Sequence, residues 1–151
     1  MFKILVVDDD AGLRLSIKSA FASHTKYDVT EAFDGINAME KVKTPGNKFD
    51  VVILDVDMPR LNGLETLKQI KEFDPGIIVL MLTAHATLND AVNAVKDGAY
   101  NYLSKPVSSE DLLTLVEKAL HAHSLISNIA ASAPVLVEAG RKIIYASWFQ
   151  P

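Results

Sequence analysis

The chain has 151 residues, of which 49% are hydrophobic and 23% are charged, a composition that can form one globular domain around a buried core. Its net charge of −4 argues against a nucleic acid-binding surface, which needs a basic patch, and the absence of cysteine excludes disulfides and thiolate metal sites. The apolar run at residues 4–7 is too short for a signal peptide or a membrane span, so we expect a cytoplasmic protein without a membrane partner.

Short apolar runs alternate with amphipathic stretches along the chain. The apolar runs predict strands at residues 2–7, 27–32, 51–54, 77–82 and 100–103. Apolar side chains at helical spacing predict helices near residues 13–21, 36–42, 64–70, 88–95 and 108–123. Gly98 is well placed to end the fourth helix, and Ser108 begins a capping signal for the last one.

This alternation predicts the fold class. Several of the strands, residues 51–54 above all, are continuously apolar, which is typical of strands buried on both faces. Strand and helix in regular alternation indicate an α/β domain, with a doubly wound parallel sheet and helices on both faces. In such sheets, ligands bind outside the carboxyl ends of the strands, so chemistry is expected at the residues that follow each strand.

Polar residues stand at those positions after four of the predicted strands: Asp8, Asp9 and Asp10 after the first, Asp55 after the third, Thr83 after the fourth, and Lys105 with Pro106 after the fifth. Taken singly, each has a structural explanation, since aspartates cap helices and Lys-Pro often forms a turn. Taken together, clustered carboxylates need a cation, and oxygen ligands favour Mg²⁺, or Mn²⁺, over Zn²⁺. A carboxylate can also act as a nucleophile that forms an aspartyl phosphate.

Four stretches resemble the receiver domains of two-component response regulators. They are residues 6–9 (Val-Val-Asp-Asp), 52–59 (Val-Ile-Leu-Asp-Val-Asp-Met-Pro), 82–84 (Leu-Thr-Ala) and 102–106 (Tyr-Leu-Ser-Lys-Pro). The resemblance covers about residues 1–124 and implies a flavodoxin-like fold with five parallel strands in the order 2-1-3-4-5. Residues 98–103 (Gly-Ala-Tyr-Asn-Tyr-Leu) are similar to receivers of enhancer-binding transcription activators.

The resemblance also implies a role for individual residues. Asp55 would be the phosphoacceptor. Mg²⁺ would be held directly by Asp9, Asp55 and the backbone carbonyl of Asp57, and indirectly, mostly through water, by Asp8. The phosphoryl group would be bound by the Thr83 hydroxyl, the Ala84 amide and Lys105. Tyr102 would turn inward on activation, and the bond between Lys105 and Pro106 would be cis.

The same resemblance implies a switch that takes a phosphoryl group from a sensor histidine kinase or a phosphotransfer protein. Such a domain catalyses only its own phosphorylation and dephosphorylation. Leu113 and Leu115 lie off the main apolar stripe of the last helix, which favours a homodimer through the fourth helix, the fifth strand and the last helix. No direct nucleic acid binding by this chain is expected.

Two other functions fit parts of the pattern. Residues 52–57 also match the start of haloacid dehalogenase-type phosphohydrolases, in which Asp55 would be the nucleophile of a true enzyme. Against this, that family places its Asp-x-Asp first and its metal-binding acidic pair last, whereas Asp8 and Asp9 come first here. A flavodoxin-like flavin carrier is disfavoured because the three aspartates after the first strand would repel a phosphate.

The sequence predicts a domain boundary near residue 124. Residues 125–151 form an extension in which Leu125, Ile126 and Ile129 could lengthen the last helix by a turn or two. Ala133 and Pro134 would then break it, and residues 135–139 and 142–148 could form a small hairpin. The extension is either an accessory segment of a stand-alone receiver, the linker of a longer regulator, or an end without a structural role.

Overall fold

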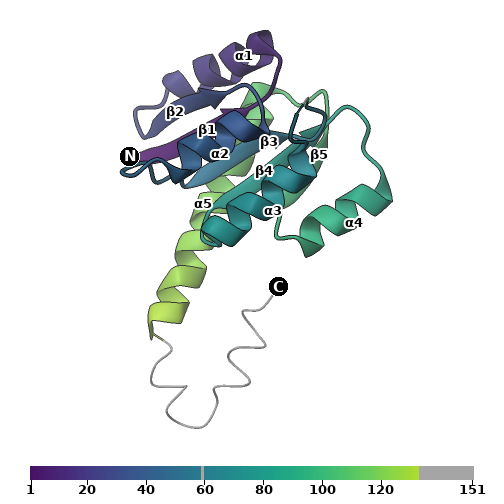
Figure 1. The fold of residues 1–151 in the computed structure, drawn as a ribbon. Coiled ribbons are helices and arrows are strands. Elements are labelled where there is room, and N and C mark those ends of the chain that lie inside the picture. Colours follow the sequence, from purple (N-terminus) through teal and green to yellow (C-terminus); the bar gives the residue numbers. More distant parts are fainter. Residues whose placement is uncertain (59, 133–151) are drawn as a thin grey trace.

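The computed structural model describes residues 1–58 and 60–132 and shows a parallel sheet with helices on both faces (Figure 1). In chain order, the elements are β1 (Phe2–Val7), α1 (Ala11–Ala22), β2 (Tyr27–Ala32), α2 (Gly35–Lys43), β3 (Val51–Asp55), α3 (Gly63–Phe73), β4 (Ile78–Thr83), α4 (Leu88–Lys96), β5 (Asn101–Ser104) and α5 (Ser109–Ser132). The predicted α/β fold class is confirmed, and the predicted strands agree with these bounds to within one residue.

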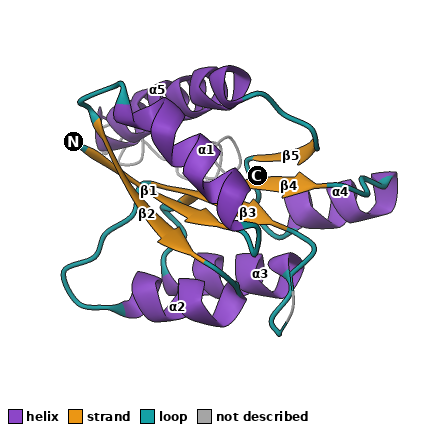
Figure 2. Ribbon diagram, turned by 90° about the horizontal axis from the view of Figure 1, so that it is seen from above, coloured by secondary structure: helices purple, strands orange, loops and turns teal. Residues whose placement is uncertain are grey.

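The apolar strands are buried on both faces, as their sequences predicted. Seen from above, α1 and α5 cover one face of the sheet and α2 and α3 the other, while α4 lies beside β5 at the edge (Figure 2). Alternate residues of β1 divide between the two cores: Ile4 and Val6 pack with α1 and α5, whereas Leu5 and Val7 pack with α2 and α3. A strand with helices on both sides therefore needs a continuous apolar run.

The strands lie in the order β2-β1-β3-β4-β5, which confirms the order implied by the resemblance. All neighbouring pairs are parallel, so the carboxyl ends of the strands meet at one edge of the sheet. The chain winds from β1 to β2 on one side and then returns to place β3 on the other side of β1. This reversal is the topological switch point, and it places the residues that follow β1 beside the end of β3.

The helix ends use the capping chemistry that the sequence indicated. The Ser108 hydroxyl accepts a hydrogen bond from the Asp111 amide at 3.0 Å, which caps the start of α5. Gly98 has φ +102° and follows the last residues of α4. The Gly98 amide donates to the Val95 carbonyl and the Ala99 amide to the Ala94 carbonyl, the pattern of a Schellman motif.

Helix α5 is longer than the stretch of residues 108–123 that its apolar spacing first predicted. It runs to Ser132, so the lengthening expected from Leu125, Ile126 and Ile129 is present, and the helix projects beyond the sheet (Figure 1). The break expected at residues 133–134 and the hairpin expected at residues 135–148 lie outside the described residues.

None of the helices within residues 1–58 and 60–132 is both long enough and apolar enough to cross a membrane.

The corner between β2 and α2 is packed tightly against the start of α3. A Cβ atom added to Gly35 would lie 2.6 Å from the Leu61 carbonyl oxygen and even closer to the Thr66 hydroxyl. We expect Gly35→Ala to lower the free energy of unfolding by about 2 kcal/mol, because backbone must move to admit the methyl group. Urea denaturation would measure the change. Gly76→Ala is the control, since its Cβ would face only the Asp74 side chain at 3.2 Å; equal losses in both variants would contradict this account.

Candidate functional site

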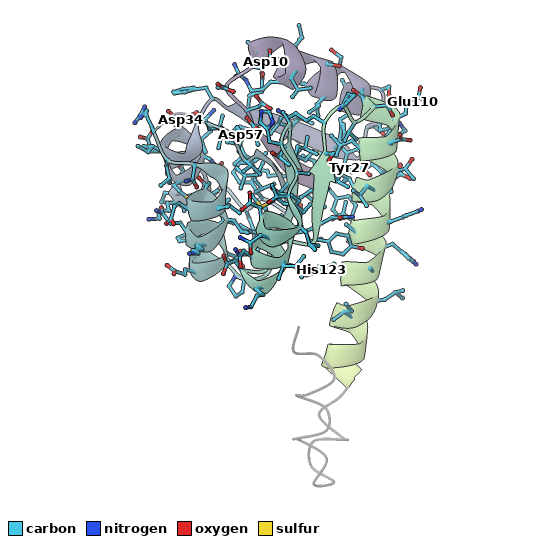
Figure 3. The ribbon with its side chains drawn as sticks, turned by 90° about the vertical axis from the view of Figure 1, so that its right-hand side faces the viewer. Asp10, Tyr27, Asp34, Asp57, Glu110 and His123 are labelled. Atoms are coloured by element: carbon cyan, nitrogen blue, oxygen red, sulfur yellow. The ribbon has the colours of Figure 1, made fainter. Side chains whose placement is uncertain are left out.

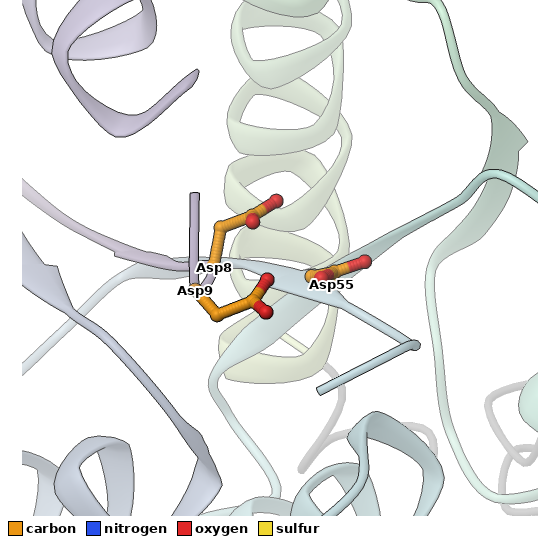
Figure 4. A group of neighbouring side chains, drawn as sticks. All are labelled: Asp8, Asp9 and Asp55. Carbon is orange, nitrogen blue, oxygen red and sulfur yellow. The ribbon is translucent and has the colours of Figure 1, made fainter. Parts of the chain in front are cut away.

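Three carboxylates meet at the carboxyl edge of the sheet. Asp8 and Asp9 follow β1, and Asp55 is the last residue of the adjacent β3. One carboxylate oxygen from each lies within 4.8 Å of the others, and the three side chains lie side by side in Figure 4. Asp8 and Asp55 are each only 3% exposed, whereas Asp9 reaches solvent. The topology thus brings Asp55 together with two residues that precede it by 46 and 47 positions, as strand-end reasoning predicted.

The third member of the aspartate run has a different role. The Asp10 side chain accepts hydrogen bonds from the Gly12 and Leu13 amides and so caps α1. The Asp10 amide in turn donates to Asp8 Oδ1 at 2.9 Å, which fixes the Asp8 carboxylate. The capping interpretation of this run is therefore realised by Asp10, whereas Asp8 and Asp9 are the members that face Asp55.

Lys105 follows β5 and pairs with two of the acids. Its Nζ lies 2.9 Å from Asp8 Oδ2 and 3.2 Å from Asp55 Oδ1. Burial opposes the charged ammonium, but the hydrogen bonds and charges of Asp8 and Asp55 outweigh it and raise the pKa of Lys105 above its ordinary value. The peptide bond between Lys105 and Pro106 is cis. One cation thus compensates two buried carboxylates.

The environment of Asp55 disfavours its charged form. Burial, and then the nearby charge of Asp8, raise its pKa from 3.8 to about 6. Lys105 and the Asp57 amide, which donates to Asp55 Oδ1 at 3.3 Å, act in the opposite direction but do not cancel the effect. The site therefore holds more negative charge than Lys105 alone can balance.

The switch residues named from the sequence lie next to this group. Thr83 is the last residue of β4 and is buried, and its hydroxyl donates to Asp57 Oδ2 at 3.2 Å while accepting from the His85 amide at 3.1 Å. Ala84 follows it and is exposed. Tyr102 lies on β5 and packs partly against the core. Its hydroxyl is buried and finds no hydrogen-bond partner in the described part of the chain, and burial raises the pKa of this phenol.

Two contacts were not found from the sequence. Arg14, one turn into α1, donates from Nη1 to the Asp8 carbonyl at 2.6 Å and from Nε to Glu31 on β2 at 3.2 Å. The bond between Thr83 and the Asp57 side chain crosses from β4 to the loop after β3. An arginine just inside the helix after an acidic run was an available signal for the first contact, whereas no local pattern indicates the second.

The chemistry of the donor set fits a hard divalent cation. The group offers only carboxylate oxygens, the ligands that Mg²⁺ and Mn²⁺ prefer, and it is open to solvent at Asp9. A buried aspartate beside a lysine is also an arrangement in which a carboxylate nucleophile can receive a phosphoryl group whose charge the lysine balances.

Comparison with known proteins places this site in a family context. Residues 4–117 match the family model "Response regulator receiver domain". The chain is 42% identical over 124 residues to the transcriptional regulatory protein ZraR of Klebsiella oxytoca, covering 82% of this chain and 27% of that protein. It therefore spans about a quarter of the length of this relative.

Solved structures agree with the sequence comparison. A CheY-like response regulator receiver domain protein from Methanospirillum hungatei JF-1 superposes with a TM-score of 0.77 at 28% identity, over 82% of this chain and 97% of that one. NtrX from Brucella abortus gives a TM-score of 0.78 at 29% identity, over 87% of this chain and 29% of that one.

The raised pKa of Asp55 predicts a pH dependence of stability without divalent cations. Because the folded state binds this proton more tightly than the unfolded state, the contribution of Asp55 is fully favourable below about pH 4 and is lost as pH rises through about 6. Asp55→Asn should therefore raise the free energy of unfolding at pH 7.5 by about 2 kcal/mol and leave it nearly unchanged at pH 4. Urea denaturation in chelator measures both values. A variant that is less stable than wild type at pH 7.5 would refute the electrostatic account.

Proposed function

The chain belongs to the response regulator receiver domain family, and on that premise we propose that it is a phosphorylation switch that accepts a phosphoryl group on Asp55. The donor would be a phosphohistidine of a sensor histidine kinase or of a phosphotransfer protein. The observation that carries the proposal is the meeting of Asp8, Asp9 and Asp55 with Lys105 at one edge of the sheet.

Each residue has a defined task in this reaction. A carboxylate oxygen of Asp55 attacks phosphorus, the new O–P bond forms as the P–N bond of the phosphohistidine breaks, and the imidazole nitrogen leaves with the bonding electrons. Asp9, Asp55 and the Asp57 carbonyl would hold Mg²⁺, with Asp8 acting through water. When bound, the metal supplies positive charge to the phosphoryl oxygens. Lys105, already at hydrogen-bond distance from Asp55, balances charge on the product.

The contacts around Thr83 suggest how phosphorylation of Asp55 would change the conformation of neighbouring elements. The Thr83 hydroxyl donates a hydrogen bond to Asp57, and a phosphoryl group on Asp55 would compete with Asp57 for that hydroxyl. The backbone amide of Ala84, the exposed residue that follows Thr83, would bind the same phosphoryl group. Tyr102 lies on β5, beside β4, and its buried hydroxyl, which has no hydrogen-bond partner among the described residues, would gain one from a rearrangement. Phosphorylation would thereby shift a pre-existing equilibrium between two arrangements of β4, α4 and β5.

The haloacid dehalogenase alternative is not favoured by this arrangement. The second acid of its Asp-x-Asp, Asp57, would have to act as a free acid or base, but its carboxylate accepts a hydrogen bond from Thr83. A domain that only phosphorylates and dephosphorylates itself should turn over almost no chromogenic phosphate ester. Sustained turnover dependent on Asp55 would support the phosphohydrolase instead.

Phosphoryl transfer tests the identity of the nucleophile. Incubation with Mg²⁺ and acetyl phosphate should add one hydroxylamine-labile phosphoryl group, detected as a mass increase, and Asp55→Asn should abolish it. Asp9→Asn should lose the response to Mg²⁺. Asp10→Asn is the matched control, because asparagine also caps helices, and it should label like wild type. Undiminished labelling of Asp55→Asn would overturn the proposal.

The apolar surface at the edge of the sheet is a candidate dimer face. Leu88, Val92 and Val95 lie at helical spacing on α4 and are 83%, 48% and 55% exposed, and Tyr100, just before β5, is 46% exposed. Leu113 and Leu115 of the last helix, which the sequence assigned to the same face, are only partly exposed and pack against the core formed with α1 and α5, so the exposed apolar surface is on α4. We propose that a second copy docks on the α4 face when Asp55 is phosphorylated.

This dimer proposal predicts a change in mass in solution. Beryllium fluoride with Mg²⁺, a mimic of the phosphoryl group, should shift the protein toward dimer in light scattering. Val92→Glu should prevent the shift without affecting phosphorylation, because it places a charge in the apolar contact. Leu15→Glu, at the 62% exposed leucine of α1, is the control and should still dimerise. A monomeric activated wild type would exclude self-association through α4.

A further inference from the structure

The loop between β3 and α3 contains a strained residue that the site described above does not use. Within residues 1–58 and 60–132, Arg60 is the only non-glycine residue with positive φ, at 66°. This left-handed region is disfavoured for a residue with a Cβ and persists where surrounding contacts hold it. Arg60 is 53% exposed at its side chain, so packing in the core is not what holds it.

The contact that holds Arg60 is an ion pair with a buried acid. Arg60 Nη1 lies 3.0 Å from Asp34 Oδ2, and the Asp34 side chain is only 4% exposed. The other oxygen, Asp34 Oδ1, accepts a hydrogen bond from the Asn37 amide at 2.7 Å and caps α2. Burying a carboxylate without partners costs free energy. Each oxygen of Asp34 has such a partner, the Arg60 guanidinium or the Asn37 amide, and the carboxylate is thereby held in place.

This ion pair joins the loop after β2 to the loop after β3. The second loop is closed at its base, where the Gly63 amide donates to the Val56 carbonyl at 3.0 Å and a Cβ on Gly63 would lie 2.6 Å from Val56 Cα. Gly35, next to Asp34, is pressed against the Leu61 carbonyl. Asp34 and Asp57 lie toward the same end of the molecule in Figure 3. The loop is therefore fixed at its base by backbone contacts and at Arg60 by charge.

We propose that Arg60 and Asp34 form a latch that positions the β3–α3 loop for metal binding. The inference rests on the proposed function, in which the Asp57 carbonyl, on the same loop three residues before Arg60, is a Mg²⁺ ligand. Without the ion pair, Arg60 loses the charge contact that offsets its left-handed backbone, and the loop relaxes to other conformations. Arg60 is thus a positioning residue: it touches neither metal nor phosphoryl group, but sets how well the site is preorganised.

Charge-removing substitutions separate the latch from an ordinary surface ion pair. In Arg60→Met and in Asp34→Asn, which keeps the helix cap, the Mg²⁺ dissociation constant measured by calorimetry should rise roughly tenfold. Arg60→Lys should restore much of the affinity, and the double variant should bind no more weakly than either single one, because both remove the same contact. Lys68→Met, which removes the exposed pair with Glu65, is the control and should bind like wild type.

Two further measurements identify the mechanism. Phosphorylation by acetyl phosphate at saturating Mg²⁺ should be little changed in Arg60→Met, whereas the Mg²⁺ concentration that gives half the rate should rise. Hydrogen exchange of the Asp57 and Leu61 amides in metal-free protein should be faster in the variant, with urea denaturation confirming that it is folded.

The outcomes distinguish the latch from the function on which it rests. If folded Arg60→Met binds Mg²⁺ as tightly as wild type, the latch is refuted, whatever the result for phosphorylation. If wild type binds Mg²⁺ but takes no phosphoryl group, the proposed function fails, and the comparison of Mg²⁺ affinities still decides the latch.

Discussion

The burial of two carboxylates side by side is the constraint around which the site is built. Asp8 and Asp55 are almost fully shielded from solvent, and the Lys105 ammonium forms an ion pair with each of them. Burial, and after it the like charge of Asp8, raise the pKa of Asp55, so both work against its charged form. The neighbouring contacts reduce this cost: Lys105 bridges the pair, the Asp10 amide binds Asp8, and the Asp57 amide binds Asp55. A divalent cation would remove the remaining imbalance.

The topology of the sheet holds Asp8 and Asp55 close together. Because β1 and β3 are adjacent and parallel, the residues after one strand and at the end of the other occupy the same edge. Buried strands fix their register through side chains packed on both faces, so the two acids cannot move apart without disrupting both cores. The energy that holds the carboxylates together therefore comes from apolar burial far from the site, not from contacts within it.

The sequence predicts the parts of this molecule that depend on periodicity. Strand positions, fold class and the convergence of Asp8, Asp55, Thr83 and Lys105 follow from apolar runs and from where they end. Periodicity does not predict which side chains form contacts between different loops. It could not separate the cap Asp10 from its neighbours, link Thr83 to Asp57, or pair Arg60 with Asp34, since each contact depends on loop geometry between segments distant in sequence. For the same reason, spacing alone does not reveal that Leu113 and Leu115 of α5 pack partly against the core.

The same electrostatic imbalance is a source of free energy for the proposed switch. A site whose charges and hydrogen-bonding groups are all paired gains little free energy when a ligand binds. A ligand can shift an equilibrium only by the difference between its binding free energies for the two states. Here two buried carboxylates share the Lys105 ammonium, the Thr83 hydroxyl donates to Asp57, and the buried Tyr102 hydroxyl has no hydrogen-bond partner among the described residues. Each is a cost that a rearrangement around a phosphoryl group and its cation can relieve. In the proposed switch, the two-state behaviour would follow from the interactions that this arrangement leaves unsatisfied, and the packed strands would transmit it by shifting as units and not by gradual deformation.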